Sequence, residues 1–445
     1  MPFAVCCTAC PACFEWNYRL IKKIVAGLSI LLALLLALAG VVAAYYWRPA
    51  LAPINPPPAE TFSRQLVEQG RVLAGIGNCA ACHTAKDGAD YAGGRGLASA
   101  FGTIYATNLT PDTQTGIGRW SLAAFQRAMR EGVRRDGDHL YPAFPYTHFT
   151  HVNDADLTAL YAYFMTRPPV YAAPRANTLP FPLNLRALQA GWKLLYFKPG
   201  ALAPDAAHGQ DWNRGRYLAE GLAHCAACHT PRNALGAEIA SSAYLGRPMV
   251  HWYAPALTSA NTAPLPWTKD ELTAFLRTGA TALHGVAAGP MSTVVEGLKG
   301  APDSDVRALA IYFADVAAAE HSKTDVDAVV KAAIAHSQKV SLVDNDRGAS
   351  LYVAACAACH SNSDGRPVAV RPELSLNSAV SLPDPANLLQ VILHGSNKPG
   401  LMPGFAQALS DADIAQLAAY LRRSRSSQPA WPELEAAVVR ARAAQ

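Results

Sequence analysis

The longest apolar stretch of the chain lies near the N-terminus, where no charged residue occurs from Ile24 to Trp47. A helix over residues 24–47 would be roughly 36 Å long, because each helical residue adds about 1.5 Å. That length is enough to cross a bilayer core of about 30 Å. Basic residues before such a run and aromatic residues at its end are typical of a span whose N-terminus lies in the cytoplasm. Here they are Arg19, Lys22, Lys23, Tyr45, Tyr46 and Trp47.

A cleaved signal peptide is the competing interpretation of this run, with Val42-Ala43-Ala44 as a candidate cleavage site. The run is longer than the usual 7–15 residue signal core, which favours a retained transmembrane anchor. We therefore expect a cytoplasmic segment over residues 1–23, a transmembrane helix over 24–47, and export of everything after Arg48. The cluster Cys6, Cys7, Cys10 and Cys13 is either part of a dispensable extension or a small metal-binding segment.

Beyond the apolar run, one helical pattern repeats three times. Each copy opens with a helix that carries a glycine and closes with a helix that begins at Asp-x-Asp, where the first Asp is the expected N-cap. A tyrosine nine residues into the closing helix should pack against that glycine. In the first two copies a further amphipathic helix begins at a tryptophan and ends at a glycine, and in the third the same stop is Gly395. The opening glycines are Gly70, Gly215 and Gly348; the closing helices begin at Asp154, Asp303 and Asp411; the tyrosines are Tyr163, Tyr312 and Tyr420; the tryptophans and stops are Trp120 with Gly132 and Trp267 with Gly279.

The repeat predicts an all-α chain in which one N-terminal transmembrane helix precedes three similar helical domains. We place these domains at residues 60–175, 205–320 and 340–425, with proline-rich spacers at 49–58 and 168–182. The length of 445 residues suits about three domains. Since no stretch combines clustered Lys and Arg with aromatic residues, the net charge of +5 does not indicate nucleic-acid binding. A mildly basic surface can still bind an acidic protein partner.

Each copy contains the sequence Cys-Ala-Ala-Cys-His, which indicates a covalently attached c-type haem. Two cysteines three residues apart lie on one side of a helical turn and can each form a thioether, while the following histidine binds the iron. A structural zinc site needs four ligands in close pairs, and a thioredoxin-type site needs a βαβ context, so neither fits this pattern. The sequence thus predicts three haem c groups, attached at Cys79 and Cys82, Cys225 and Cys228, and Cys356 and Cys359, with His83, His229 and His360 on the irons.

Methionines in Gly/Pro-rich loops are the candidates for the sixth iron ligand in the second and third copies. Met291 stands twelve residues after Gly279, and Met402 lies in Pro399-Gly-Leu-Met-Pro. A methionine ligand raises the reduction potential of a haem relative to a second histidine. Met249 is the alternative to Met291 in the second copy.

The first copy departs from this rule, because the residue twelve positions after Gly132 is Phe144, which cannot bind iron. The neighbouring histidines His139, His148 and His151 are the candidates, and we favour His148. A bis-histidine first haem should have the lowest potential of the three; with no sixth ligand it would be five-coordinate and open to small ligands. Met129 and Met165 fall within predicted helices and are expected to pack in the core.

The sequence between Ala50 and about Arg423 resembles the tri-haem cytochrome c subunits of membrane-bound periplasmic dehydrogenases, which serve the oxidation of alcohol, gluconate, fructose and related substrates. The resemblance rests on the haem motifs together with Thr107-Asn-Leu-Thr-Pro-Asp, Thr115-Gly-Ile-Gly-Arg-Trp and Trp212-Asn-Arg-Gly-Arg-Tyr-Leu-Ala-Glu-Gly-Leu. Subunits of alcohol and sugar dehydrogenases usually have Met where Phe144 stands. The variant Tyr-Pro-Ala-Phe-Pro-Tyr followed by His148 is more similar to the cytochromes that serve molybdenum hydroxylases of nicotinate, isoquinoline or aldehydes.

This resemblance implies an electron-transfer subunit in a bacterial inner membrane, with its haem domains in the periplasm. Substrate oxidation would occur on partner subunits that carry molybdopterin and iron–sulfur centres, and electrons would pass to ubiquinone or another respiratory acceptor. A flavin- or PQQ-dependent alcohol or sugar dehydrogenase is the alternative partner. A haem peroxidase that uses an open first haem is an alternative of another class. A terminal-oxidase cytochrome is not favoured, because the chain has one span and no resemblance outside the dehydrogenase group. No substrate-oxidising site is expected on this chain.

The segment from Gly191 to Pro199 places aromatic residues and leucines between two lysines. Such a composition suits a helix that lies in the interface of a lipid bilayer. A helix that packs between two domains is the equally supported alternative.

Overall fold

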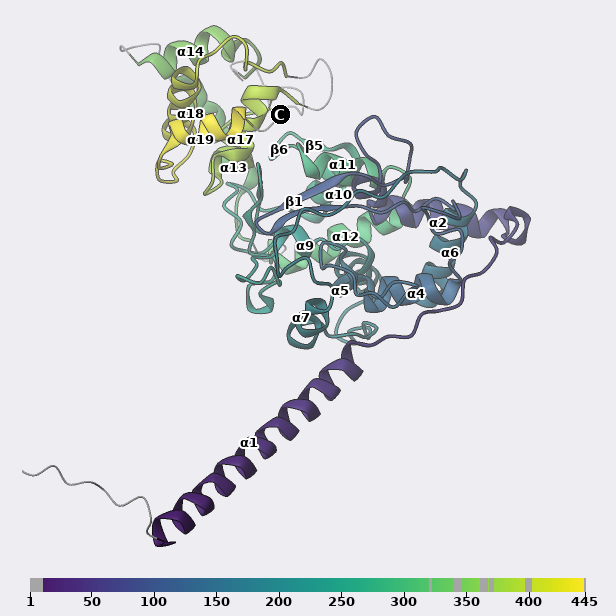
Figure 1. The fold of residues 1–445 in the computed structure, drawn as a ribbon. Helices are drawn as coiled ribbons and strands as arrows, with labels where there is room; N and C mark the ends of the chain where they lie inside the picture. The colour runs from purple at the N-terminus through teal and green to yellow at the C-terminus, as the bar shows by residue number, and fades with distance from the viewer. Residues whose placement is uncertain are drawn as a thin grey trace, which may run out of the picture.

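The computed structural model describes residues 11–319, 322–339, 346–360, 367, 372–396 and 402–443 of the chain. About half of these residues are helical, and the short strands pair as three antiparallel two-stranded hairpins. The expected mainly helical fold is therefore confirmed. Three helical units follow one long N-terminal helix, and we call them the first, second and third unit in chain order (Figure 1).

The N-terminal part and the first unit contain the elements that carry the first Cys-x-x-Cys-His motif. They are α1 (Pro11–Tyr46), the 3-10 turn η1 (Ala59–Thr61), α2 (Arg64–Ile76), α3 (Cys79–His83), β1 (Gly96–Ser99), β2 (Gly102–Tyr105), α4 (Leu122–Glu131), α5 (Tyr146–Phe149) and α6 (Asp154–Met165). Helix α7 (Leu188–Tyr196) follows in the connection to the second unit.

The second unit repeats this order with shorter strands, and the third has helices alone among its described residues. The second unit consists of α8 (Gln210–Tyr217), the π-helical turn η2 (Leu218–Leu222), α9 (Ala226–His229), η3 (Ala240–Ser242), β3 (Arg247–Pro248), β4 (Tyr253–Ala254), α10 (Lys269–Thr278), β5 (Ala280–Thr281), β6 (Gly285–Val286), α11 (Pro290–Leu298) and α12 (Asp303–Val316). After α13 (Val326–Lys339), the third unit consists of α14 (Arg347–Ala355), α15 (Ala357–His360), α16 (Ser378–Ser381), α17 (Ala386–His394), α18 (Asp411–Arg425) and α19 (Leu434–Arg442).

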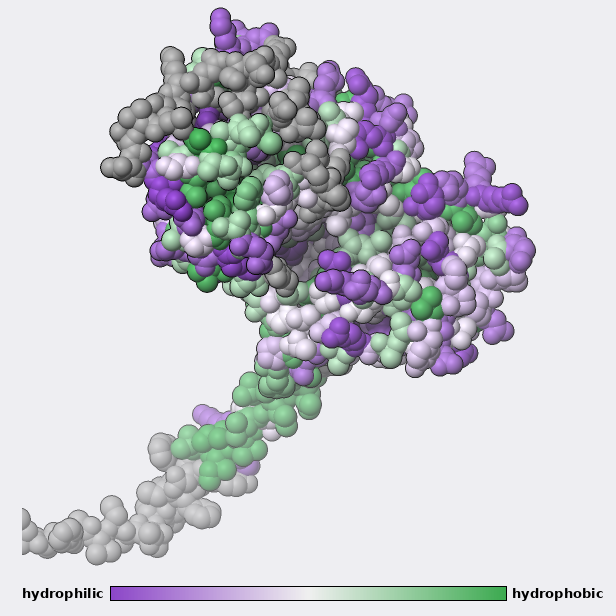
Figure 2. Space-filling view, turned by 90° about the horizontal axis from the view of Figure 1, so that it is seen from above, coloured by the Kyte–Doolittle hydropathy of each residue, from purple (hydrophilic) through white to green (hydrophobic). Residues whose placement is uncertain are grey.

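Helix α1 projects away from the three units as a straight stalk (Figure 1). Its stretch Arg19–Ala37 has a mean hydropathy of 2.3, and none of it is buried against the rest of the protein. The space-filling view shows the described part of this stalk as largely hydrophobic (Figure 2). Within the described residues, α1 is the one helix long and apolar enough to cross a membrane. A retained anchor and a signal sequence both satisfy that criterion at this end of a chain.

The opening and closing helices of every unit cross at a glycine, as the sequence predicted. A Cβ atom added to Gly70, Gly215 or Gly348 would overlap a backbone carbonyl of the closing helix. The same atom would stand 2.7, 2.9 and 2.7 Å from the Cβ atoms of Tyr163, Tyr312 and Tyr420, respectively. All three tyrosines are buried, at 7%, 4% and 5% exposure. The repeated glycine and tyrosine thus let each helix pair approach closely, and that prediction is confirmed.

The N-caps of the closing helices differ from the prediction by one residue. The helices begin at Asp154, Asp303 and Asp411, so these aspartates lie inside the first turn. The caps are the preceding residues, and the side chains of Asn153 and Ser410 accept hydrogen bonds from backbone amides of the first turn. The aspartates instead place negative charge at the positive end of the helix.

The buried side chains of the first and second units form one continuous core. Leu73 and Ile76 of α2 belong to the same cluster as Leu222 and Leu298 of the second unit. The third unit has a separate core. That core includes Trp431, Val438 and Ala441 of the C-terminal segment, which lie beyond residue 425, where the sequence placed the end of the domain. The limits 60–175 and 205–320 remain predictions, because packing alone does not divide this shared core.

Candidate haem sites

Each Cys-x-x-Cys-His motif forms one short helical turn directly after the opening helix of its unit. These turns are α3, α9 and α15, and the six cysteines of the three motifs are free thiols. Residues three apart on a helix lie on the same side. Each pair of sulfur atoms can therefore reach one flat group placed against the turn.

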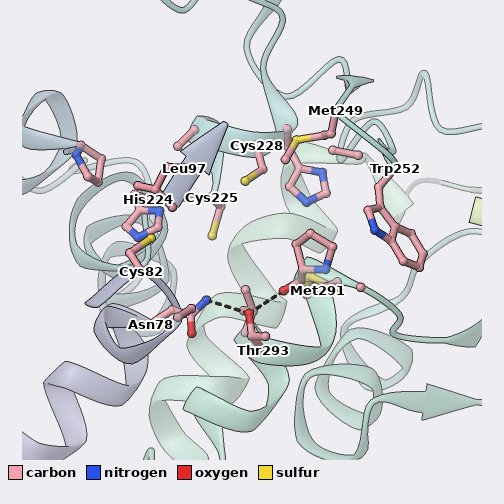
Figure 3. A pocket seen from close by; sticks show the side chains of 18 of the residues that line it. Asn78, Cys82, Leu97, His224, Cys225, Cys228, Met249, Trp252, Met291 and Thr293 are labelled. Atoms are coloured by element: carbon pink, nitrogen blue, oxygen red, sulfur yellow. Dashed lines mark hydrogen bonds between the residues drawn. The ribbon is translucent and has the colours of Figure 1, made fainter. Parts of the chain in front are cut away.

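The three motifs open onto one continuous cavity of about 2630 Å³. Ordinary ligand pockets measure roughly 300–1,000 Å³, so this cavity has room for more than one large group. Apolar side chains form much of its wall, as a porphyrin face requires. Figure 3 shows Cys82 of the first motif and Cys225 and Cys228 of the second around the same part of the cavity. Cys79, Cys356, Cys359 and the three motif histidines complete the set of motif side chains on its wall.

The histidine of every motif is oriented by a backbone carbonyl. The Nδ1 atom of His83 lies 2.7 Å from the carbonyl oxygen of Thr107, and that of His229 lies 2.7 Å from the oxygen of Pro255. The corresponding distance from His360 to Pro372 is 3.3 Å. Since a carbonyl only accepts, Nδ1 carries the proton and Nε2 keeps its lone pair. A carbonyl on the second ring nitrogen is the usual support of a metal-binding imidazole.

Loss of solvent lowers the pKa of all three motif histidines, and the carbonyl hydrogen bonds offset this only in part. The imidazoles are thus neutral at physiological pH, as a metal ligand must be. The motif turns, their histidine orientation and the apolar cavity all fit covalently bound haem c.

The cavity wall also carries cations that the sequence motifs did not reveal. Arg95 and Arg247 each follow a glycine with positive φ, Gly94 and Gly246, and each lines the cavity near a motif cysteine. The Nε atom of Arg247 is buried without a hydrogen-bond partner. Such a buried donor fits the carboxylate groups that a haem carries. A Gly-Arg pair follows the haem motif in each of the first two units, and this repeated pair could have identified the two arginines from the sequence.

Both methionines predicted as sixth ligands line the cavity. Met291 is the second residue of α11, directly after the turn at Gly289, whose φ is +52°. Met402 also lies on the wall, although Pro399 to Leu401 of its loop lie outside the described residues. The alternative, Met249, lines the cavity on the side of Trp252 (Figure 3). The structure therefore brings both Met249 and Met291 to the second site.

In the first unit, Phe144 occupies the cavity wall at the position that corresponds to Met291. Its ring packs on that of Phe149, at a centroid distance of 5.2 Å. Met129 and Met165 are buried in the core, at 6% and 4% exposure, which confirms their expected packing role. Met129 also contributes to the cavity wall.

The geometry does not bring His148 to the first site. Its Nδ1 lies 2.9 Å from the carbonyl oxygen of Glu220, and its Nε2 lies 2.9 Å from the carboxylate of Glu238. Helix α5 is a single turn that directs this imidazole toward the second unit, where both partners lie. His148 would have to break both hydrogen bonds to bind the first iron, so the structure does not support the sequence prediction of this ligand.

The two other histidines of this loop are also engaged elsewhere. His139 contacts the carbonyl oxygen of Tyr46 and the ammonium of Lys193, and His151 contacts the carbonyl oxygen of Gly200. Neither lines the cavity. The first site therefore has no imidazole from the 139–151 loop on its wall.

The first and second sites are held together by a direct hydrogen bond. Asn78, which precedes Cys79, donates from Nδ2 to the Oγ1 of Thr293, two residues after Met291, at 3.1 Å (Figure 3). Close by, a Cβ on either Gly75 or Gly297 would overlap the carbonyl of the other glycine. The motif turn of one site and the methionine helix of the other are thus in direct contact.

Comparison with protein families agrees with this geometry. Residues 67–168 match the family described as cytochrome c, and residues 343–421 match the family described as cytochrome c oxidase, cbb3-type, subunit III. The second match shows that the resemblance is not confined to dehydrogenases, contrary to the expectation from the sequence. It covers the third unit alone.

Three curated relatives span most of the chain. One of the subunits of the nicotinate dehydrogenase of Pseudomonas putida is 46% identical over 92% of this chain, which spans 34% of that longer protein. The fructose dehydrogenase cytochrome subunit of Gluconobacter japonicus is 38% identical, over 83% of this chain and 81% of its own length. The gluconate 2-dehydrogenase cytochrome c subunit of Pantoea cypripedii is 40% identical, over 81% of this chain and 85% of its own length.

Proposed function

Because the chain belongs to the family of cytochrome c subunits of dehydrogenases, we propose that it binds three haem c groups and relays electrons from a dehydrogenase subunit to a membrane acceptor. The observation that carries this proposal is the shared cavity with three Cys-x-x-Cys-His turns, each with its histidine Nδ1 on a carbonyl. Haem iron supplies one-electron transfer when it is bound. A common cavity would keep three such groups near one another.

The side chains of this chain hold and shield the cofactors. Each cysteine pair would form two thioethers, and His83, His229 and His360 would bind the irons through Nε2. Met291 and Met402 would supply the sixth ligands of the second and third sites. The apolar wall excludes water and thereby favours the less charged, reduced state of the iron.

The haem count is tested by mass analysis of the mature polypeptide. Three covalent porphyrin additions are expected, and replacement of Cys225 and Cys228 by Ser should remove one of them. The matched control is Cys13→Ser, which lies outside the three motifs and should leave the mass addition unchanged. A wild-type chain with two additions, or with colour that acid acetone extracts, would refute the count of three.

We propose a molybdenum hydroxylase as the partner enzyme. The nicotinate dehydrogenase subunit is 46% identical to this chain, against 38% and 40% for the fructose and gluconate dehydrogenase subunits. Phe144 at the sixth-ligand position supports the same branch. Co-purification after detergent extraction tests the proposal. A partner with molybdopterin and iron–sulfur centres is expected, whereas a flavin- or PQQ-containing dehydrogenase would overturn it.

We further propose that α1 anchors the chain in a bacterial inner membrane, with the haem units in the periplasm and ubiquinone as acceptor. The apolar stretch Arg19–Ala37 and the basic residues before it support this orientation. Sedimentation with membranes after an alkaline wash is expected of the mature chain. An N-terminus that begins after Ala44 in the mature protein would show cleavage instead.

Ligand binding at the first haem is a second candidate function, and Phe144 is the observation that favours it. A phenylalanine at the sixth position, with His148 turned away, leaves the first site without a ligand from the 139–151 loop. Peroxide turnover by the purified chain tests this candidate. An oxidised protein whose EPR spectrum shows only low-spin, six-coordinate haem would contradict it.

A further inference from the structure

Helix α7 has its polar and apolar residues on the wrong sides for a helix that faces water. Lys193 is 4% exposed, whereas Leu194 is 68% exposed and does not line the haem cavity; Leu195 and Leu188, 68% and 46% exposed, border that cavity. A surface helix of a water-soluble protein normally buries its leucines and exposes its lysines. The outer face of α7 therefore suits contact with an apolar environment.

The inward orientation of Lys193 is fixed by three hydrogen bonds. Its Nζ donates to the carbonyl oxygens of Glu131 and Gly132, at 2.5 and 2.7 Å, and to Nδ1 of His139 at 3.0 Å. The two carbonyls are the C-terminal end of α4, where the helix dipole attracts a cation. Burial lowers the pKa of Lys193 to about 7, but its donors are satisfied. Rotating α7 to hide its leucines would break all three bonds.

The same contacts tie α7 to the end of α1. His139 lies with Nε2 2.9 Å from the carbonyl oxygen of Tyr46, the last residue of α1, and its ring stacks on that of Tyr46. Tyr46 and Lys193 thus bind opposite nitrogens of one imidazole. Figure 1 shows α7 close to the C-terminal end of α1. Trp47, directly after α1, is 67% exposed.

The segment before α7 extends the exposed apolar surface. Phe181 is 79% exposed, Leu183 is 36% exposed and Leu185 is 45% exposed. This segment is held on the same loop of the first unit, because Arg186 donates to the carbonyl of His139 and the Tyr141 hydroxyl donates to that of Asn184. We call this surface the leucine face; it is formed by Phe181, Leu185 and Leu194, which do not line the haem cavity, and by Leu183, Leu188 and Leu195 at the edge of that cavity.

We propose that the leucine face lies in the interface of the bilayer that α1 crosses, as a second membrane contact of the chain. The inference rests on the proposed anchoring by α1. It favours lipid over a protein partner because the face adjoins the end of an apolar helix that has the length of a membrane span. Exposed leucines with Trp and Tyr at their border are typical of interfacial helices, and Trp192 and Tyr196 are half-buried there.

The position of α7 also bears on the haem cavity. Leu188, Trp192 and Leu195 contribute to the wall of that cavity. A bilayer against the leucine face would therefore border the cavity. The alternative from the sequence, a helix that packs between two domains, is compatible with this inference. Trp192 on the inner side of α7 donates to the carbonyl of Leu235 in the second unit.

Photo-crosslinking of the full-length, haem-loaded chain in vesicles tests the inference. A photoreactive p-benzoylphenylalanine replaces Leu194, Leu31 of α1 or Val439 of the third unit in separate variants. Leu31 and Val439 are both 53% exposed, so they are matched in accessibility. After irradiation, lipid adducts are measured by mass spectrometry. We expect adducts at positions 194 and 31 and none at position 439.

The three positions separate the two proposals. Lipid adducts at position 31 but not at position 194 would overturn the inference about α7 and leave the anchor intact. Adducts at neither position would contradict the anchor itself. A protein crosslink at position 194, to a second copy or to a dehydrogenase subunit, would also overturn the lipid assignment.

A charge variant gives a second measurement that keeps the fold intact. Leu185→Glu places a carboxylate on the leucine face, at a residue that does not line the haem cavity, and should abolish the lipid adduct at position 194. Val439→Glu is the matched control and should leave that adduct unchanged. An unaltered haem absorption spectrum in both variants would show that the units remain folded. Retention of the adduct in Leu185→Glu would contradict the inference.

Discussion

The first and second units share a scaffold but differ at the position of the sixth iron ligand. In both, a helix ends at a glycine with positive φ, Gly132 or Gly279, and a loop returns to the cavity. Twelve residues later the first unit has Phe144 and the second has Met291. The helix and its glycine stop are alike in the two units, but the segment that follows differs: Met291 lies within helix α11, whereas Phe144 lies just before the shorter helix α5.

The loop of the first unit serves the contact between the units. Phe144 packs on Phe149, and Phe149 packs on His224 of the second unit, with ring centroids 5.2 and 5.6 Å apart. His148 bonds to Glu220 and Glu238 of the second unit. The segment that offers an iron ligand in the second unit therefore forms contacts between the two units in the first.

The largest expected effect comes from the feature that both units share. Gly70→Ala and Gly215→Ala should each destabilise their unit by about 3 kcal/mol or more, because the new Cβ overlaps a backbone carbonyl that cannot move alone. Thermal unfolding and haem content of each variant are the measurements.

Gly191→Ala provides the control for these substitutions. Nothing lies within 4 Å of a Cβ at Gly191, which is inside α7. Alanine there should raise stability by about 0.5–1 kcal/mol through its helix propensity. Equal tolerance of alanine at positions 70, 215 and 191 would show that the helix crossings are not close.

The exchange of the two ligand-position residues tests the difference between the units. Met291→Phe should lower the potential of one haem and open it to carbon monoxide, whereas Phe144→Met should raise the potential of another. We expect shifts of at least about 59 mV, which is a tenfold change in a one-electron equilibrium. Redox titration with EPR measures both.

The conservative variant Met249→Leu separates the alternatives at the second site. If Met291 is the ligand, this variant should leave the reduction potentials of the first and second haems unchanged. A shift in Met249→Leu without one in Met291→Phe would assign the second iron to Met249.

Local sequence patterns predicted the scaffold, and long-range contacts account for what they did not predict. The helix stops at Gly132 and Gly279 and the motif turns follow from local spacing. The glycine and tyrosine of each helix pair lie far apart in the chain, but they were predictable because they recur at matching places in three copies. The orientation of His148 does not follow from the repeat, because it depends on contacts with Glu220 and Glu238 of the second unit. A histidine near a vacant ligand position was the available signal, and it carried no information about the contacts of His148 with the second unit.

An intermediate effect on stability is expected from the ionisation of Lys193, which donates a hydrogen bond to the carbonyl of Gly132 at the end of α4. In the second unit the carbonyl of the corresponding Gly279 accepts from the amide of Ala287. The pKa of Lys193 is lowered to about 7 by burial, so the unfolded chain binds more protons there between pH 7 and about 10. The free energy of unfolding should therefore rise over this range, by on the order of 2 kcal/mol.

Thermal unfolding at several pH values measures this dependence. Lys193→Met should remove the rise between pH 7 and 10, since no proton is then released on folding at this site. Lys198→Met, on the exposed end of the same segment, is the matched control and should keep it. A pH dependence identical in all three proteins would contradict the role of Lys193.

The smallest effects are expected where the two units are most alike on their surfaces. Arg130 bonds to Asp154 and Arg277 bonds to Asp303, each at 2.6 Å, and these aspartates are 76% and 97% exposed. Asp154→Asn and Asp303→Asn should each lower the free energy of unfolding by at most about 1 kcal/mol, because solvent screens exposed ion pairs.

Replacement of the arginines should destabilise the protein more, since Arg130 also donates to the carbonyl of Val152 and Arg277 to those of Leu298 and Ala301. Double-mutant cycles on each pair, read by thermal unfolding, would separate the two contributions. Equal losses for aspartate and arginine variants would mean that the ion pair, and not the carbonyl contacts, joins these helices.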